Sequence, residues 1–499
     1  MHHDIDDTTA RDQAAEVLPV VVVGGGPAGL AAAITLAGYG VDCLLVERRV
    51  EPSPLPRATG VSLRTMERLR AWGIEGAARA GGDDVEFRMR VCHTLAEVAS
   101  GYAIDVGYPT RDQSLTASPV APGCIPQDHL EAVLRAHLRT LPAARLRLGA
   151  AVEDVRLHAD RAEVVLRDAG EAGTRTVAAR YVVGADGPHS LVRDRLGIGT
   201  RASAPDRHAL AVIARAPLWS LAGDHRYGLY AIEHPAGAGT FLPAGPPDRW
   251  LYGFEWDPTT ERLADYPAGR LVDRIRAAAG DPDLPVQVEH VSSFSFTAAI
   301  ADRFRHGRAF LAGDAAHRVT PRGGTGLNTA FADGFDLGWK LAWVLQGWAP
   351  AALLDTYEAE RRPVAEHNVA RSIDPEGSRR PAVDEMHVDL GGRISHLWLD
   401  GTPGAAPVST LDLVGPGLTL FTGPGVRAMG IGTGAAAPHP DAPVTTRTVD
   451  GRVARGLGIP PGGGLLVRPD GVPVSAWSRP AHRRRGRSRP VRTAAGASR

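Results

Sequence analysis

The chain has 499 residues, of which 43% are hydrophobic and 22% charged, the composition of a globular protein long enough for two or three domains. Its 56 basic and 56 acidic residues give a formal net charge of zero, which offers no general attraction to nucleic acid or to an anionic membrane. Three cysteines without close spacing exclude a cysteine-based metal cluster or a disulfide framework, and the single lysine, Lys340, leaves almost no room for Schiff-base chemistry.

The N-terminal segment, residues 1–16, is polar and acidic, unlike the basic and then apolar start of a signal peptide. We therefore expect a disordered tail here and a cytoplasmic protein. The apolar stretch from Pro19 to Ala37 has the length of a membrane span, but glycines and a proline interrupt it. This interruption predicts a strand, a turn and a helix instead of a span.

The strand is predicted at Val20–Val23, because a continuous β-branched run is typical of a buried parallel strand. A Gly-x-Gly-x-x-Gly fingerprint and an alanine-rich helix follow it. In this pattern Gly24 makes the tight turn, Gly26 lets the backbone approach a pyrophosphate, and Gly29 lets the helix pack on the strand. The pyrophosphate is expected at the helix N-terminus, where free N–H groups and the helix dipole favour negative charge.

A second strand, Val41–Val46, ends in Glu47, close to the distance of about 20 residues at which an acid binds the ribose 2′-hydroxyl of a dinucleotide. An acid at this position repels a 2′-phosphate, so FAD or NAD fits better than NADP. The first unit is thus predicted to bind an adenine dinucleotide.

The middle of the chain is predicted to be mixed α/β structure. Ile125–Leu141 is expected to form a helix, and residues 146–177 to form hairpin strands. Residues 200–300 contain strand-like segments separated by proline and glycine turns, which predicts an open sheet with one exposed face. Residues 309–370 combine a short strand, a glycine-rich turn and long helices.

Two further motifs carry a family resemblance. One is Gly-Ala-Asp-Gly-Pro-His-Ser-Leu-Val-Arg at residues 184–193, and the other is Gly-Asp-Ala-Ala-His-Arg-Val-Thr-Pro-Arg-Gly-Gly-Thr-Gly-Leu-Asn at residues 313–328. Together with the glycine fingerprint, Arg57 and Gln127, they make residues 17–375 resemble the class A flavoprotein monooxygenases, the aromatic hydroxylases of the p-hydroxybenzoate hydroxylase type.

The resemblance implies an α/β fold with a Rossmann-like FAD-binding domain, an inserted and mainly β substrate-binding domain, and a small thioredoxin-like C-terminal domain. The C-terminal unit has no cysteine, so it cannot run dithiol chemistry and is expected to be structural. The arginine-rich end is expected to be a disordered, solvated tail. The expected boundaries are residues 17–80, 119–199 and 300–375 for the FAD-binding domain, 81–118 and 200–299 for the substrate-binding sheet, 393–477 for the C-terminal unit, and 1–16 and 478–499 for the tails.

The resemblance also assigns roles to single residues. Asp314 is expected to accept a hydrogen bond from the ribityl chain, and the amides of Leu327 and Asn328 are expected to face the pyrimidine edge of the flavin. Arg57 is expected at the flavin or its phosphates, and Gln127 at the adenosine side. The full set of expected FAD-binding residues, which includes an Asp-Gly pair also implicated in pyridine-nucleotide binding, is Gly24, Gly26, Pro27, Ala28, Gly29, Glu47, Arg48, Arg57, Gln127, Asp186, Gly187, Gly313, Asp314, Pro321, Gly324, Gly326, Leu327 and Asn328.

The implied reaction is hydroxylation of an aromatic or polyketide-like substrate with FAD, O2 and transiently bound NAD(P)H, through a flavin C4a-hydroperoxide. Catalytic candidates are Pro321, expected beside flavin and substrate, and His317, because histidine titrates near neutral pH. No metal, nucleic acid or membrane partner is expected, and the protein is expected to be a monomer or homodimer. Four aromatic residues of the middle sheet are expected either to line the substrate cavity or to belong to the ordinary hydrophobic core: Phe241, Tyr252, Phe254 and Trp256.

Other functions are compatible with the same scaffold. Flavin-dependent halogenases resemble it too, but the chain lacks their Trp-x-Trp-x-x-Pro motif, and Lys340 lies in the helix after the third motif. A flavin that only shapes a cavity for non-redox polyketide cyclisation would have the same protein contacts, so the sequence leaves this alternative open. The presence of three motifs disfavours a non-enzymatic FAD-binding regulator.

Overall fold

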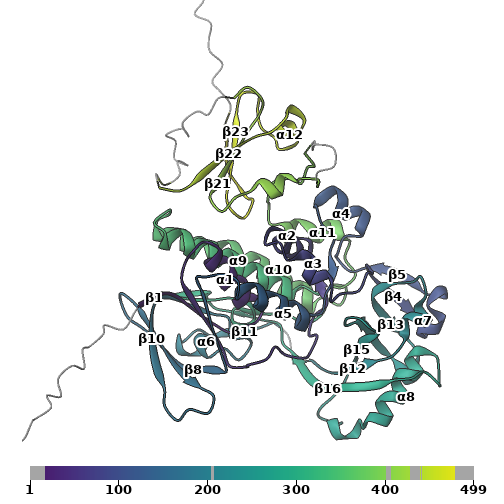
Figure 1. Cartoon of the computed structure of the whole chain (residues 1–499). Helices are drawn as coiled ribbons and strands as arrows, with labels where there is room; N and C mark the ends of the chain where they lie inside the picture. Colours follow the sequence, from purple (N-terminus) through teal and green to yellow (C-terminus); the bar gives the residue numbers. More distant parts are fainter. Residues whose placement is uncertain (1–16, 204–206, 400–405, 427–438, 440, 478–499) are drawn as a thin grey trace, which may run out of the picture.

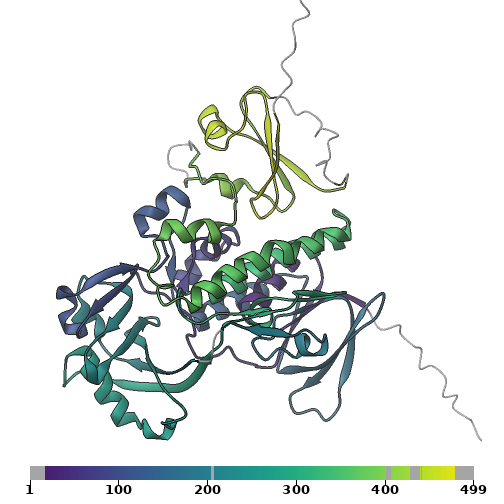
Figure 2. The ribbon, with the colours of Figure 1, turned by 180° about the vertical axis from the view of Figure 1, so that it is seen from behind.

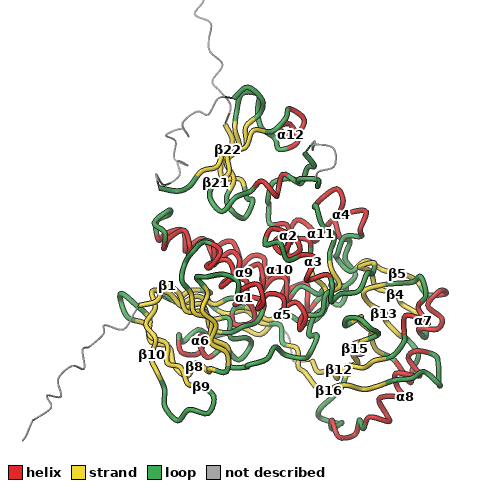
Figure 3. The backbone as a smooth tube through the Cα atoms, viewed as in Figure 1, coloured by secondary structure: helices red, strands yellow, loops and turns green. Residues whose placement is uncertain are grey.

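The computed structural model describes residues 17–203, 207–399, 406–426, 439 and 441–477. Both predicted tails, residues 1–16 and 478–499, lie outside this part of the chain. Figure 1 shows two large sheet-based regions and a smaller C-terminal unit, and Figure 3 shows helices concentrated between them. Among the described helices, none has the combination of length and apolar character that a membrane crossing requires.

A largely parallel sheet forms the centre of the first region, in the order β18-β19-β10-β1-β2-β7, with β8 and β9 attached to β10. Val20–Val23 pairs with β10 on one side and with β2 on the other. Val20–Val23, Tyr181–Gly184 of β10 and Cys43–Val46 of β2 are buried, which explains the predicted β-branched run. The strands are β1 (Val17–Val23), β2 (Cys43–Glu47), β7 (Ala144–Leu148), β8 (Ala150–Leu157), β9 (Ala162–Asp168), β10 (Arg175–Gly184), β18 (Arg305–His306) and β19 (Ala309–Leu311).

Long helices pack closely against this sheet. At Gly334 a Cβ atom would lie 2.0 Å from the carbonyl oxygen of Ala28, so α1 and α9 touch backbone to backbone. Both views place α9 and α10 between the central sheet and the C-terminal unit (Figures 1 and 2). The helices of this region are α1 (Pro27–Gly38), α2 (Leu63–Ala71), α3 (Glu75–Arg79), α5 (Gln127–Leu138), α6 (Leu191–Arg195), α9 (Gly326–Leu345), α10 (Asp355–Ile373) and α11 (Ala382–Leu390).

The carboxyl ends of the parallel strands meet at one edge of the sheet. After β10, the amide of Ala185 donates to the carbonyl of Val23 at 2.8 Å. After β19, the amide of Ala312 donates to the carbonyl of Gly184 at 2.9 Å. The three sequence motifs therefore begin side by side, at the edge where open α/β sheets bind their ligands.

The second region is a seven-stranded sheet in the order β16-β12-β15-β14-β13-β4-β5. One face packs under α7 (Leu218–Ala222) and α8 (Ala268–Ala279). The other face is turned toward the first region, because Arg249 of β15 pairs with Asp128 of α5 at 2.8 Å. The strands are β4 (Glu86–Cys92), β5 (Tyr102–Asp105), β12 (Arg207–Arg215), β13 (Tyr227–Ile232), β14 (Gly239–Pro243), β15 (Arg249–Glu255) and β16 (Gln287–Phe296).

The four aromatic residues expected either in the cavity wall or in the core belong to the core. Phe241, Tyr252 and Phe254 lie in the buried cluster beneath α8, and Trp256 packs against the same cluster. The remaining elements connect the two regions: β3 (Gly60–Val61) pairs with β6 (Gly123–Cys124), and a small sheet combines β11 (Thr200–Ala202), β17 (Ala299–Ala301) and β20 (His317–Arg318), while α4 (Arg111–Ala117) follows β5.

An ion network around the buried Lys340 joins the C-terminal unit to α9 and α10. The ammonium group of Lys340, fully buried on α9, lies 2.8 Å from Asp336 Oδ2 and 3.0 Å from Glu360 Oε2. Arg468 of the C-terminal unit donates to Glu360 Oε1 at 2.8 Å. The unit contains β21 (Leu418–Thr422), β22 (Val444–Thr448), β23 (Gly464–Val467), β24 (Pro473–Trp477) and α12 (Gly451–Gly456), and its likeness to thioredoxin stays a prediction.

Candidate functional site

The glycine turn between β1 and α1 leaves one position open. Gly24 has φ +106°, and a Cβ there would lie 2.2 Å from the Ala185 carbonyl oxygen. A Cβ on Gly29 would lie 1.9 Å from the Gly24 carbonyl oxygen. At Gly26 a Cβ would meet nothing within 4 Å, and this residue starts α1 without a side-chain cap. Pro27, the first residue of α1, has no N–H to donate, so the first-turn amides that face space an anionic ligand can enter begin with Ala28.

Glu47 lies at the end of β2 and holds the glycine turn. Its Oε2 accepts a hydrogen bond from the Gly25 amide at 2.7 Å, and its Oε1 accepts one from the Arg49 amide at 2.8 Å. Arg48, between them, is exposed. The predicted ribose-binding acid is therefore beside the fingerprint, and it also fixes the shape of the turn.

Asp186 has a structural task that the sequence did not reveal. Ser190 Oγ donates to Asp186 Oδ1 at 2.5 Å, and the Val192 amide donates to Asp186 Oδ2 at 3.0 Å. Burial raises the pKa of Asp186 in spite of these hydrogen bonds. The carboxylate thus closes the turn into α6, in which Gly187 has φ +86°.

Asp314, in the third motif, is an acid to whose side chain no other described residue donates a hydrogen bond. Its side chain is exposed, yet burial in the surrounding protein raises its pKa, opposed by the charges of His317, Arg57 and Arg318. The exposed carboxylate is thus accessible to a ligand from solvent. The neighbouring Gly313 has φ +62°, and a Cβ there would lie 3.1 Å from Ala28 Cβ. The uncovered carboxylate fits a ligand that carries hydroxyl donors, as the ribityl chain of FAD does.

Gln127 lies beside the segment that carries Arg57, because its amide donates to the Ala58 carbonyl at 2.9 Å. Gln127 Nε2 donates to Glu131 Oε1 at 2.7 Å across one turn of α5. Burial raises the pKa of Glu131, opposed by Gln127, Arg135 and Arg57. Because Arg57 acts on the charges of both Glu131 and Asp314, it links the two predicted ends of the cofactor site. Sequence reasoning missed Glu131, although its spacing of four residues from Gln127 on one helix could have indicated it.

The third motif ends in a glycine turn and the free end of a long helix. Gly323 and Gly324 have φ +85° and +64°. The Gly324 amide donates to the carbonyl oxygen of Pro321 at 3.0 Å, and Pro321 is exposed. The helix α9 then begins at Gly326 without a side-chain cap. Its first amides, including those of Leu327 and Asn328, form a positive end that can stabilise an anion.

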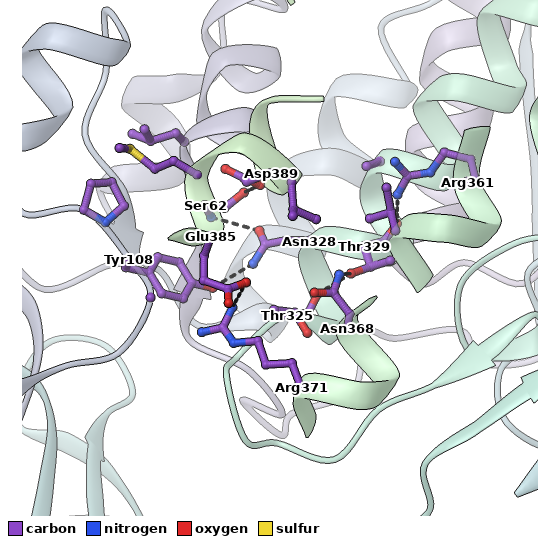
Figure 4. Close-up of a pocket in the computed structure, with 17 residues that line it drawn as sticks. Ser62, Tyr108, Thr325, Asn328, Thr329, Arg361, Asn368, Arg371, Glu385 and Asp389 are labelled. Atoms are coloured by element: carbon purple, nitrogen blue, oxygen red, sulfur yellow. Dashed lines mark hydrogen bonds and ion pairs between the residues drawn. The ribbon is translucent and has the colours of Figure 1, made fainter. Parts of the chain in front are cut away.

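The side chain of Asn328 joins three segments around this turn (Figure 4). Its Nδ2 donates to the Gly60 carbonyl at 3.0 Å and to Tyr108 Oη at 2.9 Å. Its Oδ1 accepts from the Ser62 amide and from Thr65 Oγ1, both at 2.9 Å. The sequence predicted a role for the Asn328 backbone only. Apart from a longer contact with the Gly324 carbonyl at 3.4 Å, the partners of this side chain are distant in the chain, so no local pattern indicated its role.

His317 is paired deep inside the protein. Its Nε2 lies 2.6 Å from Asp333 Oδ2, which also accepts from the Gly313 amide at 3.1 Å. Arg361 Nε donates to Asp333 Oδ1 at 2.7 Å. Burial alone raises the pKa of Asp333, but His317 and Arg361 outweigh burial and lower it. This network positions the Gly313 turn against α9, and direct catalysis by His317 stays a prediction.

A cavity lined by both polar and apolar residues lies beside the first turns of α9, against α10, α11 and the segment of Tyr108 (Figure 4). Asn368 Nδ2 donates to Thr329 Oγ1 at 2.9 Å, and Arg371 Nη1 pairs with Glu385 Oε2 at 3.1 Å. The N-terminal end of α9 is therefore held by the Asn328 side chain on one side and by Asn368 of α10 on the other, while the Arg371–Glu385 pair joins α10 to α11.

The chain matches known proteins over most of its length. Residues 17–372 match the family described as an FAD binding domain. Aklavinone 12-hydroxylase of Streptomyces purpurascens is 37% identical, covering 92% of this chain and 94% of the relative. Tetracenomycin A2 monooxygenase-dioxygenase of Streptomyces glaucescens is 31% identical, covering 93% of each chain. A crystal structure of aklavinone-11 hydroxylase with FAD and aklavinone has a TM-score of 0.78 at 32% identity, covering 93% of this chain and 96% of the other.

These relatives insert oxygen, which supports the predicted monooxygenase activity over the non-redox alternative. They also agree with the predicted fold class, a Rossmann-like FAD-binding domain that carries an inserted sheet. With a match that spans nearly the whole chain and a fold that brings the predicted motifs to one sheet edge, this protein is a member of the class A, FAD-dependent monooxygenases.

Proposed function

We propose that this protein hydroxylates a flat, polycyclic aromatic substrate of the polyketide type. The observation that carries the proposal is a row of small residues across five strands of the second sheet. Cross-strand pairing aligns Ala211 with Ser292 and Gly253, Gly253 with Thr240, and Thr240 with Ala231. We call these five residues, Ser292, Ala211, Gly253, Thr240 and Ala231, the small-residue row.

The small-residue row lies on the sheet face opposite the helix-covered core. The neighbouring row, Val212, Tyr252, Phe241 and Tyr230, is large and buried beneath α8. Paired residues of antiparallel strands share a face of the sheet. The large side chains are therefore gathered on the face under α8, and the small side chains on the opposite face. Four of the five residues in the small-residue row are half-buried, as a surface that receives a flat ligand would be.

FAD binding is assigned to the residues described above. The open Gly26 turn would hold the pyrophosphate, Glu47 the ribose, and Asp314 the ribityl chain, with the α9 N-terminus at the pyrimidine edge. When bound, FAD supplies the redox chemistry of oxygen activation. The positive end of α9 stabilises negative charge at this edge, and the sheet keeps water from the reacting face.

The balanced reaction takes one substrate C–H, O2, NAD(P)H and a proton to one C–OH, NAD(P)⁺ and water. One glycine fingerprint is present, so we expect NAD(P)H to bind transiently while FAD keeps the dinucleotide site. A cytoplasmic location suits this use of NAD(P)H and the three free, buried cysteines. We expect a monomer or a homodimer, with the C-terminal unit in a structural role.

Anaerobic reduction tests the proposal. The purified holoprotein is mixed with NADPH and then NADH, with and without aklavinone, and flavin absorbance is followed. We expect bleaching that aklavinone accelerates and that the single-ring p-hydroxybenzoate does not. Equal acceleration by the single-ring phenol would contradict the polycyclic assignment. A flavin that stays oxidised against both nucleotides would contradict the reaction itself.

A further inference from the structure

Tyr108 occupies the junction between the two sheet regions. It follows β5 in the chain, and its ring stacks on Phe87 of β4 with centroids 4.6 Å apart and planes at 23°. Both residues belong to one buried cluster, and the half-buried Met89 and Leu229 pack against it. Leu229 lies two residues before Ala231 on β13, so it shares the sheet face of the small-residue row.

The hydroxyl of Tyr108 reaches the other side of this junction. It donates to the Gly324 carbonyl at 2.8 Å and accepts from Asn328 Nδ2 at 2.9 Å (Figure 4). Burial raises the pKa of Tyr108, so the hydroxyl stays protonated and can donate. It therefore ties the glycine turn of the third motif to the first turn of α9, at the edge where the flavin pyrimidine is expected.

Tyr108 packs closely on the side of Gly60, although another side of it lines the cavity described above. A Cβ on Gly60 would lie 3.0 Å from Tyr108 Oη and 3.3 Å from Phe87 Cε1. Both rings thus lie close against the segment that carries Gly60. Asn328 Nδ2 also donates a hydrogen bond to the Gly60 carbonyl, at 3.0 Å. A shift of Phe87 must move either Tyr108 or this segment, because protein interiors are close-packed.

We propose that Tyr108 is a positioning residue that couples substrate contact on the small-residue face to the geometry of the flavin-facing turn before α9. A ligand on that face reaches Met89 and Leu229, these residues pack on the Phe87–Tyr108 pair, and Tyr108 holds the turn. The inference rests on the proposed function. It adds the prediction that substrate accelerates flavin reduction through this contact chain.

Two variants separate the two contacts of Tyr108, its hydrogen bonds to the turn before α9 and its stacking on Phe87. Tyr108→Phe removes the hydrogen bonds to the turn and keeps the ring, so we expect FAD to bind about tenfold more weakly, the value of one such hydrogen bond. Phe87→Leu removes the stacking and keeps the hydroxyl, so we expect FAD affinity within about twofold of the wild type. In both variants the acceleration of anaerobic flavin reduction by aklavinone is expected to fall several-fold.

Tyr252→Phe is the matched control. Its hydroxyl is also buried and donates to the Gly237 carbonyl at 2.8 Å, but it lies in the core on the opposite sheet face. We expect this variant to keep both FAD affinity, measured by quenching of flavin fluorescence, and the acceleration ratio. Unchanged ratios in both Tyr108→Phe and Phe87→Leu would overturn the inference, as would an equal loss in Tyr252→Phe.

The two proposals fail in different ways. If aklavinone does not accelerate reduction in the wild type, the proposed function is contradicted before any variant is compared. If the wild type responds and the variants respond equally, only the coupling is contradicted. Thermal unfolding of the FAD-free protein shows whether Tyr108→Phe is folded. If this variant is poorly folded, the acceleration ratio of Phe87→Leu still decides between the outcomes.

Discussion

Arg393 of the C-terminal segment and Glu67 of α2 form a buried ion pair, with Arg393 Nη2 at 2.6 Å from Glu67 Oε1 and both side chains no more than 5% exposed. Burial alone raises the pKa of Glu67, but Arg393 and Arg64 outweigh it, so that this pKa is lowered. Ser118 Oγ also donates to Glu67 at 2.8 Å. The helix that follows the Gly60 segment is therefore held from the far end of the chain.

Replacing Arg393 by alanine should strongly destabilise the protein, because it leaves Glu67 buried with Arg64 as its remaining cation. We expect a loss of about 3 kcal/mol in the free energy of unfolding, measured in urea. Arg70→Ala is the control, since its pair with Asp412 is partly exposed and should contribute at most about 1 kcal/mol. Equal effects of the two substitutions would contradict the anchoring role of the buried pair.

The lowered pKa of Glu67 sets the direction of a pH dependence. The stabilisation is complete above the ordinary glutamate value of 4.5 and is lost as pH falls through the lower folded value. Denaturant unfolding should therefore show a Glu67 contribution that is the same at pH 7 and 5 and falls at pH 4 and 3, and Glu67→Gln, already weakened at pH 7, should lack this fall. Parallel curves for the two proteins would mean that other groups carry the acid sensitivity.

Two glycines of the fingerprint should behave in opposite ways. Gly26→Ala places its Cβ in open space on a backbone with φ −82°, so we expect unchanged stability of the FAD-free protein and FAD binding weakened at least about tenfold. Gly24→Ala combines φ +106° with a 2.2 Å approach to Ala185, so we expect a loss of stability of about 1–3 kcal/mol or more. Thermal unfolding and FAD titration of both variants measure the difference. A Gly26 variant that is destabilised and binds FAD normally would refute the assignment.

Asp314→Asn should lose FAD without losing the fold. A charge-assisted hydrogen bond from a ribityl hydroxyl contributes about 1.5–3 kcal/mol, so we expect FAD to bind roughly ten- to a hundredfold more weakly. The pKa of Asp314 is raised by burial, so protonation favours the folded state and stability of the FAD-free protein should gain as pH falls through it. The asparagine variant should lack this gain. Fully yellow variant protein after dialysis would contradict the role of Asp314.

Gly253→Val should narrow the range of substrates. A Cβ at Gly253 would meet only ordinary contacts, with Leu251 Cδ2 at 3.6 Å the nearest, so the fold should tolerate the change. The added methyl groups would stand in the small-residue row, and we expect kcat/KM for aklavinone to fall roughly tenfold to a hundredfold. NADH oxidation without substrate serves as the control and should be unchanged. Equal kcat/KM values for aklavinone in the variant and the wild type would contradict substrate binding on this face of the sheet.

The sequence predicted the local parts of the site and missed the parts made by distant pairing. Gly24, Glu47 and Asp314 stand in motifs whose chemistry is readable over a few residues. Tyr108 was not found, because its hydroxyl meets Asn328 across 220 positions of the chain. Asp186 was assigned to cofactor binding only, since nothing in an Asp-Gly pair shows that the same carboxylate caps a helix.

The second sheet shows a further limit. Alternating aromatic residues such as Phe241 and Tyr252 predict a strand with two unlike faces, but not which face the helices cover. The structure places these rings under α8 and leaves Gly253 and Ala211 toward the first region. The proposed substrate surface therefore rests on small residues, which attract little notice in a sequence.

Lys340 is the single lysine of the chain, and in the folded protein its amine is wholly enclosed by Asp336 and Glu360 at the contact with the C-terminal unit. An acylating reagent in solution consequently finds no lysine on the folded molecule. Acylation at Lys340 would require the contact between α9, α10 and the C-terminal unit to part. The rate of that single labelling event, followed by mass spectrometry, thus measures how often the contact opens.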